Sequence, residues 1–472
     1  MRLEHDFLGE MQIPDDVYYG VQTLRAVNNF KITGHKLDPD FIVALAIVKK
    51  AAVIANMKTI AGCMPEQVGE AVKQAASEII DGKLHDQFVV DAIQGGAGTS
   101  MNMNVNEVIA NRAIEILGGQ KGNYELVSPN NHINMSQSTN DALPTAIRIT
   151  AVRKGRYLVQ QLNDLADAFD AKGEEFRRVL KMGRTHLQDA VPITLGQEFK
   201  AYAAATRRSA KRIKRSVESL YTINMGATAV GTGINAEPTY IEEVARQISK
   251  LTDETFISAP DLVDATQNID DLSDVSSSLK VCALALSKIC NDLRLMAGGP
   301  KCGLFEINLP PMQPGSSIMP GKVNPVIPET VNQTAFLVVG NDQAIAMAVE
   351  AGQFELNVME PVVAYLLFNS MTFLANAVNT LNNKCVKGIT ANMDRCHEMV
   401  DNSIGIITAL TPHIGYEQSS AVAREALKTG KPIKKIIQDK GLLPVDEMNV
   451  ILSPEEMTKP GIAGKQFLKC KV

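Results

Sequence analysis

With 472 residues, the chain is too long for one ordinary hydrophobic core, so we expect two or three domains or one elongated domain. Its 47 lysine and arginine residues against 52 aspartate and glutamate residues give a net charge of −5 without a strong basic run, which argues against nucleic acid as the main partner. The seven cysteines, Cys470 the last of them, include no CxxC pair, so zinc ribbons and disulfide frameworks are poor interpretations.

The first residues, MRLEHDFLGEMQIPDD, carry charges from the second position onward and lack the apolar segment of a signal peptide. No later stretch approaches the roughly 18 apolar residues of a membrane span. We therefore expect no membrane partner and a reduced, cytoplasmic location.

Two packing helices are predicted between Asp40 and about Gly82, because apolar residues recur there at helical spacing. The segment 94–107, QGGAGTSMNMNVNE, then places a glycine turn with Thr99 before a helix rich in asparagine. A turn with a polar cap is the simplest interpretation. Four amide or acid side chains so close together spread over several helix faces, however, so we expect some of them to be buried and hydrogen-bonded.

Another polar cluster occupies 128–141, SPNNHINMSQSTND. Ser138, Thr139 and Asn140 are each suited to cap the helix that follows, so capping explains one of the three. That helix keeps its apolar spacing from 141 to about 180, which makes it unusually long.

After this helix, the segment 183–198, GRTHLQDAVPITLGQE, places Thr185 and His186 in a turn closed by proline and glycine. A lone histidine is more often structural or solvated than catalytic. The next predicted helix, 197–221, carries a basic face that we expect to be solvated or paired with acidic neighbours.

The strongest periodicity lies between 269 and 298, where apolar residues from Leu272 to Met296 alternate steps of three and four. Further helices are expected at 326–351 and 356–382. Long helices with apolar seams must bury those seams against other long helices, so we predict a mainly α fold with an elongated central bundle.

The remaining chain changes to shorter helices separated by glycine and proline, which predicts a small C-terminal domain. We predict an N-terminal domain over 1–140, a central helical-bundle domain over 141–395 and a C-terminal domain over 396–472. Bundles of long helices often associate between subunits.

The segment 315–325, GSSIMPGKVNP, contains two glycines, two serines and two prolines, which predicts a shaped loop. Ser316 and Ser317 lie beside a glycine, while Lys322 and Asn324 supply a positive charge and an amide. This combination suits an anionic ligand, although loops of such composition are usually only connections. A Walker loop is excluded, since five residues instead of four separate the glycines and valine follows the lysine.

Together, these clusters resemble the motifs of the fumarase/aspartase superfamily of lyases. The loop GSSIMPGKVNP is similar to the superfamily signature GSSxMPxKxN, and the GTSMNMNVNE and STND segments are similar to two further blocks. The three motifs occur in the expected order, and the resemblance covers nearly the whole chain. One departure is Ala97, where many members have serine, so this chain lacks that hydroxyl group.

Within the superfamily, the RLEHDFLGE, YYGVQT, INMSQSTND and KVNPVIPE segments are similar to the ammonia-lyase branch that acts on aspartate. Class II fumarases typically have lysine at the position of Met135 and a different sequence after Pro325. The resemblance implies reversible deamination of L-aspartate to fumarate and ammonia by a homotetramer, without a cofactor or metal ion. The Cβ proton would leave first, through an aci-carboxylate intermediate that preorganised donors stabilise.

The resemblance also implies a role for each residue of the motifs. Ser316 is the base that removes the Cβ proton, which requires N–H donors and a nearby cation that stabilise its alkoxide. Glu329 orients His186 through a hydrogen bond, and His186 either donates a proton or only binds. The remaining residues bind substrate: Lys322 and Asn324 the α-carboxylate, Thr99, Ser138, Thr139 and Ser317 the β-carboxylate, and Asn140 and Thr185 the amino group.

The resemblance further implies that three subunits contribute to each active site, and we expect the long helices to form the tetramer core. The loop 315–325 would act as a lid with glycine hinges. Two rival interpretations stay open. A class II fumarase would use the same base to hydrate fumarate, and a non-catalytic structural protein would retain only the fold, as among lens crystallins.

Overall fold

The computed structural model describes residues 1–60 and 63–468, so Cys470 lies outside the described residues. The chain divides into two compact units that alternate along the sequence. Unit 1 comprises Met1–Val159, Lys211–Ala283 and Phe336–Ala375, and unit 2 comprises Gln160–Ala210, Leu284–Ala335 and Asn376–Val472. The three domains predicted from the sequence stay a prediction.

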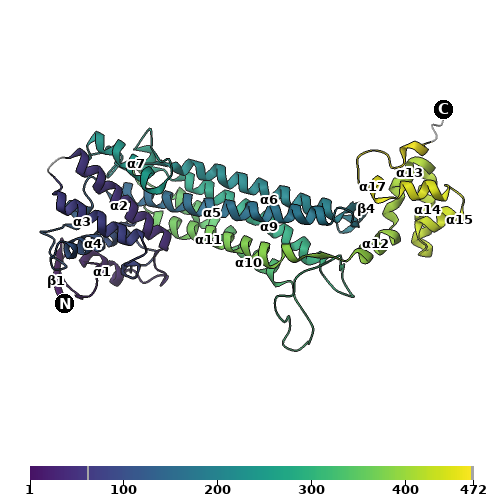
Figure 1. The fold of residues 1–472 in the computed structure, drawn as a ribbon, viewed down its shortest axis with the longest axis horizontal. Coiled ribbons are helices and arrows are strands. Elements are labelled where there is room, and N and C mark those ends of the chain that lie inside the picture. Colours follow the sequence, from purple (N-terminus) through teal and green to yellow (C-terminus); the bar gives the residue numbers. More distant parts are fainter. Residues whose placement is uncertain (61–62, 469–472) are drawn as a thin grey trace. The chain divides into compact units, whose positions relative to one another are not determined.

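Long helices confirm the predicted mainly α fold with a helical bundle (Figure 1). Each of the five longest contributes a segment to both units. They are α5 Thr139–Glu175, α6 Leu195–Glu218, α9 Asp270–Met296, α10 Val326–Glu350 and α11 Glu360–Lys384.

Unit 1 contains a hairpin, a layer of helices around α2 and a short parallel strand pair. Helix α2 begins after Asp38, whose side chain accepts a hydrogen bond from Asp40 N, and it is buried on nearly every face because α3 and α7 pack against it. The elements are β1 Arg2–Asp6, β2 Gly9–Ile13, α1 Val21–Asn29, α2 Pro39–Thr59, α3 Glu66–Ile80, α4 Thr99–Ile116, β5 Thr222–Ile223, α7 Pro238–Thr252, β6 Ile257–Ser258 and α8 Asp264–Gln267.

Unit 2 contains an antiparallel hairpin packed on short C-terminal helices. The segment 183–198, expected as a turn, forms most of the hairpin β3–β4 and the start of α6. Leu180 and Met182 of β3 join a buried cluster with Ile406 and Leu410, which anchors the hairpin. The elements are β3 Leu180–Thr185, β4 Gln188–Thr194, β7 Ile307–Asn308, β8 Thr390–Ala391, α12 Met393–Asn402, α13 Ile407–Ile414, α14 Tyr416–Thr429, α15 Ile433–Asp439, α16 Val445–Ile451 and α17 Pro454–Met457.

The apolar seam of α9 is filled within the chain itself. All its members are at most 4% exposed: Leu272, Val275, Leu279, Cys282, Leu286, Ile289, Leu293 and Met296. Other apolar side chains of the bundle helices remain exposed in the single chain, including Leu284 at 54% and Phe336 at 68%. The seam is therefore part of the core of the single chain and presents no apolar surface to solvent.

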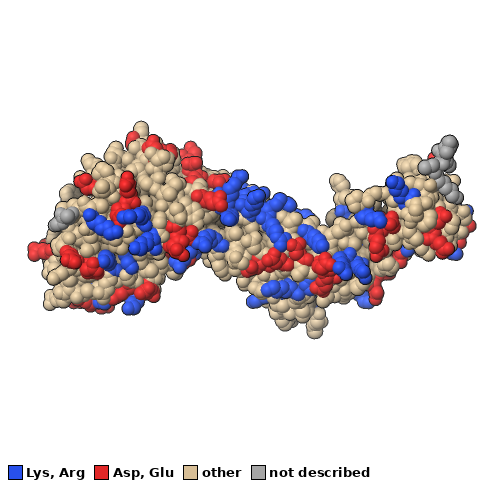
Figure 2. Space-filling model, turned by 45° about the horizontal axis from the view of Figure 1, so that its top comes forward, with Lys and Arg blue, Asp and Glu red and all other residues tan. Residues whose placement is uncertain are grey.

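The basic face of α6 combines both expected arrangements. Arg207 forms ion pairs with Asp167 and Asp170, while Arg208 and Lys211 are exposed without an ion-pair partner among the described residues. Figure 2 shows lysine and arginine side chains in a row over this helix. The solvated interpretation therefore holds for much of this face.

One described stretch, Glu360–Gly388, has the length and hydropathy of a membrane-spanning helix, in contrast to the expectation from the sequence. In this structure 61% of its most apolar window is buried inside the molecule. A core helix that packs against other helices has the same composition as a membrane span, so this stretch is weak evidence for one.

Candidate active site

Thr99 is the first residue of α4, where the chain leaves a glycine turn. Gly98 precedes it with φ of +80°, and Thr99 Oγ1 donates to Gly96 O at 2.8 Å. Thr99 and Ser100 line an open cavity of about 510 Å³ that Arg25 also lines. Arg25 is ion-paired with Asp6, which lines the same cavity, so the group that this cavity still offers to a carboxylate is the Ser100 hydroxyl at the N-terminal end of α4.

The polar residues of α4 are buried and hydrogen-bonded, as the sequence predicts. Asn102, Asn104, Asn106 and Glu107 are each at most 1% exposed. Glu107 accepts hydrogen bonds from the backbone N–H groups of residues 20, 22 and 23. The three asparagines bond to side chains or backbone of neighbouring segments, so polar groups on several faces of α4 fix the loops around it.

Ser138 is the residue that caps α5, because its Oγ accepts from Asn140 N at 3.2 Å. Thr139 is 8% exposed, and its Oγ1 accepts from Asn102 Nδ2 at 3.1 Å, which leaves the hydroxyl proton to donate elsewhere. Asn140 Nδ2 donates to Ala229 O at 2.7 Å, so its Oδ1 is the atom that can accept from an ammonium group.

Two buried ionisable side chains, Asp141 and Lys49, fix the turn that precedes α5. Asp141 accepts hydrogen bonds from the N–H groups of residues 138, 226 and 228, and burial nevertheless raises its pKa to about 6. Lys49 Nζ donates to Asn134 Oδ1 and Gln137 Oε1, and burial lowers the pKa of Lys49 to about 7. Lys49 is not predictable from the sequence as a site residue, because its place in an apolar helix pattern gives no sign of its partners.

Thr185 and His186 lie at the tip of the β3–β4 hairpin. The two residues between the strands, His186 and Leu187, have φ of +51° and +61°, the geometry of a type I′ turn, which usually contains asparagine and glycine. Both side chains are exposed, and Leu187 is 73% exposed. Two non-glycine residues in left-handed geometry are a signal of a constrained functional site.

In the loop 315–325, two backbone N–H groups donate hydrogen bonds to the side chain of Ser316. Ser316 Oγ accepts hydrogen bonds from Ile318 N at 3.2 Å and from Met319 N at 3.0 Å. Backbone N–H groups that point at a hydroxyl oxygen stabilise negative charge on it. The backbone N–H groups of Ile318 and Met319 are functional groups that residue types cannot reveal, since every residue except proline supplies one.

The base of the loop is closed by backbone and amide hydrogen bonds. Gly315 N donates to Lys322 O at 2.7 Å, and Asn324 Nδ2 donates to Gly315 O at 2.8 Å. A Cβ atom on Gly315 would lie 2.8 Å from Asn324 N, so glycine is needed here for close approach. Ser317 and Lys322 are exposed, and Lys322 has no ion pair among the residues that the structure describes.

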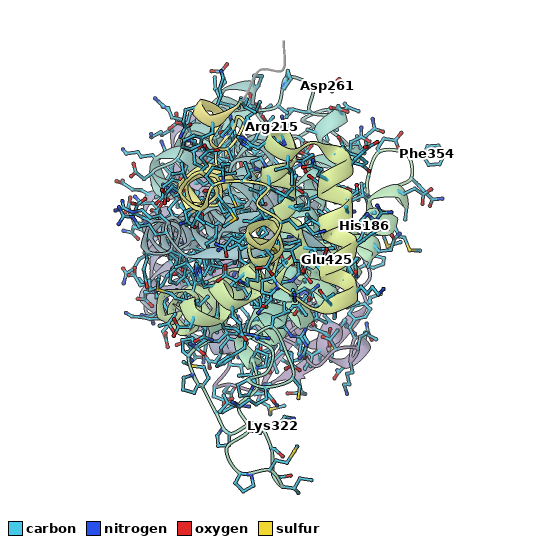
Figure 3. The ribbon with its side chains drawn as sticks, turned by 90° about the vertical axis from the view of Figure 1, so that its right-hand side faces the viewer. His186, Arg215, Asp261, Lys322, Phe354 and Glu425 are labelled. Carbon is cyan, nitrogen blue, oxygen red and sulfur yellow. The ribbon has the colours of Figure 1, made fainter. Side chains whose placement is uncertain are left out.

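Within unit 2, the structure places the loop and the hairpin tip apart. Figure 3 shows Lys322 on a loop that extends away from the helices, while His186 lies at another side of the view. Glu329 is in the first turn of α10, and the described part of the chain shows no hydrogen bond between Glu329 and His186. Within unit 1, Thr139 and Asn102 are hydrogen-bonded to each other, so α4 and the start of α5 form one cluster.

Comparisons with known proteins match nearly the full length of the chain. A family model described as Lyase matches residues 9–340, and one described as Fumarase C C-terminus matches residues 406–459. The chain is 56% identical to aspartate ammonia-lyase of Bacillus subtilis over 468 residues, 99% of this chain and 98% of that protein. It is 53% identical to aspartate ammonia-lyase of Helicobacter pylori over 98% of both chains.

Solved structures of similar fold are also found. A fumarate lyase:delta crystallin from Brucella melitensis bound to cobalt has a TM-score of 0.94 and 47% identity, over 97% of this chain and all of that one. A class II fumarase from Schistosoma mansoni has a TM-score of 0.92 and 34% identity, over 97% of this chain and 99% of that one.

Proposed function

The chain belongs to the fumarase/aspartase superfamily of lyases, and we propose that it catalyses the reversible deamination of L-aspartate to fumarate and ammonia. The observation that supports the chemistry best is the pair of backbone N–H groups at Ser316 Oγ. An alcohol is a weak base unless its alkoxide is stabilised, and these donors, fixed before the substrate arrives, supply such stabilisation.

In the proposed reaction, Ser316 removes a proton from Cβ of L-aspartate. Negative charge then develops on the β-carboxylate as the aci-carboxylate, and the C–N bond breaks in a second step. The hydroxyl groups of Ser138, Thr139 and Ser317 would donate to this carboxylate as its charge grows, and Thr99 would join them once its hydroxyl proton turns away from Gly96 O. Donors whose orientation is already fixed lower the barrier because they need no reorganisation in the transition state.

The other residues would bind the α-carboxylate and the amino group of the substrate. Lys322, free of ion-pair partners among the described residues, would bind the α-carboxylate together with the remaining N–H of Asn324. The amino group would lie against Asn140 Oδ1, Thr185 and His186. For His186 two roles fit: it either donates the proton that the leaving amine takes or only holds the ammonium group.

We further propose a homotetramer in which three subunits complete each site. One support is that Glu329 and His186, which the resemblance pairs, form no hydrogen bond in the described part of a single chain. Another is the set of exposed apolar side chains on the long helices, because contact with another subunit would remove their apolar surface from water. The proposed partners are therefore the small-molecule substrate and other copies of this chain. A cytoplasmic location fits an enzyme that converts L-aspartate.

A class II fumarase is the alternative function. It would use the same base and intermediate, but the chain has Met135 where fumarases typically carry lysine, and its identity to the Schistosoma mansoni fumarase is 34% against 56% for the Bacillus subtilis enzyme. The test is the ultraviolet absorbance of fumarate formed by the purified protein from L-aspartate and, separately, from L-malate. The proposal expects turnover of L-aspartate, and turnover of L-malate alone would replace it with the fumarase assignment.

A further inference from the structure

A buried carboxylate in unit 2 connects two segments of the proposed site. Glu306 is fully buried and immediately precedes β7. Its Oε1 accepts a hydrogen bond from Arg184 Nη1 at 2.8 Å, and its Oε2 lies 3.3 Å from Lys181 Nζ as an ion pair without an aligned hydrogen bond. Both cations belong to β3, so a single side chain binds this strand through two positive charges.

The main chain fixes the position of this carboxylate. Glu306 N donates to Met296 O at 2.8 Å, and Glu306 O accepts from Asn392 N at 2.9 Å. Asn392 Nδ2 in turn donates to Phe305 O at 3.0 Å, and the Asn308 side chain donates to Asn392 Oδ1 at 2.7 Å. Glu306 is therefore held by hydrogen bonds on both sides of its backbone, and its carboxylate is a fixed point for β3.

The two segments that meet at Glu306 both lead to residues of the proposed site. Arg184 is followed directly by Thr185 and His186 at the hairpin tip. In the other direction, β7 leads through residues 309–314 into the loop of Ser316. We infer that Glu306 is a positioning residue that sets the hairpin tip relative to the strand feeding the Ser316 loop. This inference rests on the proposed function for its effect on catalysis.

A purely structural ion-pair cluster is the simpler interpretation to be tested. A buried carboxylate is costly to desolvate and is weak evidence for stability, whereas a fixed geometry is the better-attested reason to retain one. Glu198 offers a matched control in the same cluster. Its Oε2 accepts from Lys181 Nζ at 3.0 Å, but it lies on α6 and its side chain is 25% exposed.

The experiment compares Glu306→Gln with Glu198→Gln as full-length protein. Both variants remove one negative charge near Lys181, but only the first removes the charge that pairs with Arg184. For Glu306→Gln we expect kcat for L-aspartate to fall on the order of 10- to 100-fold with a smaller change in KM, because a misplaced hairpin tip disturbs the reacting geometry. For Glu198→Gln we expect kcat close to that of wild type.

Hydrogen exchange separates the inference from the proposed function. Amides of residues 183–187 and 309–325 should exchange faster in Glu306→Gln than in Glu198→Gln, whatever substrate the enzyme uses. A Glu306→Gln protein with a lower Tm but unchanged kcat and unchanged exchange in these segments would overturn the inference. If Glu306→Gln does not fold, Arg184→Lys decides: a lower kcat supports the link, and wild-type kcat refutes it. An inactive wild type with the expected exchange pattern would reject only the proposed function.

Discussion

Ser316 is the residue on which the proposed chemistry depends most. Replacement by alanine removes the base but leaves the exposed loop free of new contacts, so we expect kcat/KM for L-aspartate to fall by about 10²- to 10⁴-fold with little change in Tm. Steady-state kinetics and thermal unfolding measure the two effects. Ser77→Ala is a suitable control, because Ser77 Oγ only donates to Lys73 O within its own helix. Unchanged turnover in Ser316→Ala would remove this residue as the base.

Glu360 provides a prediction about pH. It is 1% exposed, and its Oε1 has no hydrogen-bond partner among the described residues. Burial raises its pKa to about 8, an effect that Arg148 opposes and Asp271 reinforces. Because the unfolded chain has an ordinary carboxyl pKa, folding takes up a proton between about pH 4.5 and 8. The stability contribution of Glu360 is thus fully present below pH 4.5 and is lost as pH rises toward 8.

We therefore expect Glu360→Gln to raise the free energy of unfolding at pH 8 by roughly 1–3 kcal/mol, since glutamine has no proton to lose. The difference should shrink toward zero as pH falls to about 4.5. Urea titrations of both proteins at several pH values give the measurement. A variant that is less stable than wild type at pH 8 would instead indicate an ionised Glu360 paired with Arg148.

At the scale of elements, the start of α4 depends on a glycine for two reasons. Gly98 has φ of +80°, and a Cβ atom there would overlap the Cδ2 atom of buried Leu143. Gly118, after the same helix, has φ of +81° with nothing within 4 Å of such an atom. An alanine at either position would be strained by the positive φ, but only at Gly98 would its Cβ atom overlap another side chain.

Gly118→Ala is expected to cost about 1–2 kcal/mol of unfolding free energy from backbone strain alone. Gly98→Ala should cost about 1–3 kcal/mol more from overpacking, and it should also lower kcat/KM because Thr99 is displaced. Denaturant titration and kinetics of the pair test this. Equal stability and equal activity of the two variants would show that the turn tolerates a side chain beside Leu143.

The helices are predictable from the sequence, but the hairpin at 180–194 is not. Apolar spacing locates α2, α3, α5 and α9 within a few residues, because each buries a stripe of its surface. The hairpin turn is formed by His186 and Leu187, which lack the asparagine and glycine that normally indicate such a turn. The residues that pack against β3 in the core lie far from it in the sequence, and so does Glu306, which accepts a hydrogen bond from Arg184. The spacing of apolar residues cannot reveal such contacts.

The loop 315–325 is likewise only partly predictable from the sequence. Its composition predicts a shaped loop with Ser316 and Lys322 exposed to ligand, but the donors at Ser316 Oγ are backbone groups that composition cannot identify. The closed base also changes the hinge hypothesis. Gly315 is tightly packed against Asn324, so a lid motion would rotate the closed loop as a body about residues 309–314.

At the scale of the whole molecule, the proposed tetramer predicts that assembly and activity fail together. The α9 seam is filled inside the chain, so a charge there would unfold the subunit, whereas Phe336 on α10 is 68% exposed. We expect Phe336→Glu to fold but to lose both the tetramer in light scattering and activity by 10-fold or more, as a buried charge opposes association.

The control is Leu427→Glu, since Leu427 on α14 is 71% exposed and lies outside the long helices. It should remain tetrameric and active. An active monomer of Phe336→Glu would contradict shared active sites, and loss of the tetramer in both variants would contradict the choice of the long helices as the interface.

Release of ammonia from L-aspartate, with Ser316 as the base, is the reaction on which the proposed function depends. The most direct measurement is the formation of fumarate and ammonia by the purified wild-type protein from L-aspartate, beside L-malate and beside the Ser316→Ala variant. We predict both products in equal amounts from L-aspartate, little or none from L-malate, and a loss of both in the variant. Wild-type protein that forms fumarate from L-malate but no ammonia from L-aspartate would contradict the proposed aspartate ammonia-lyase activity.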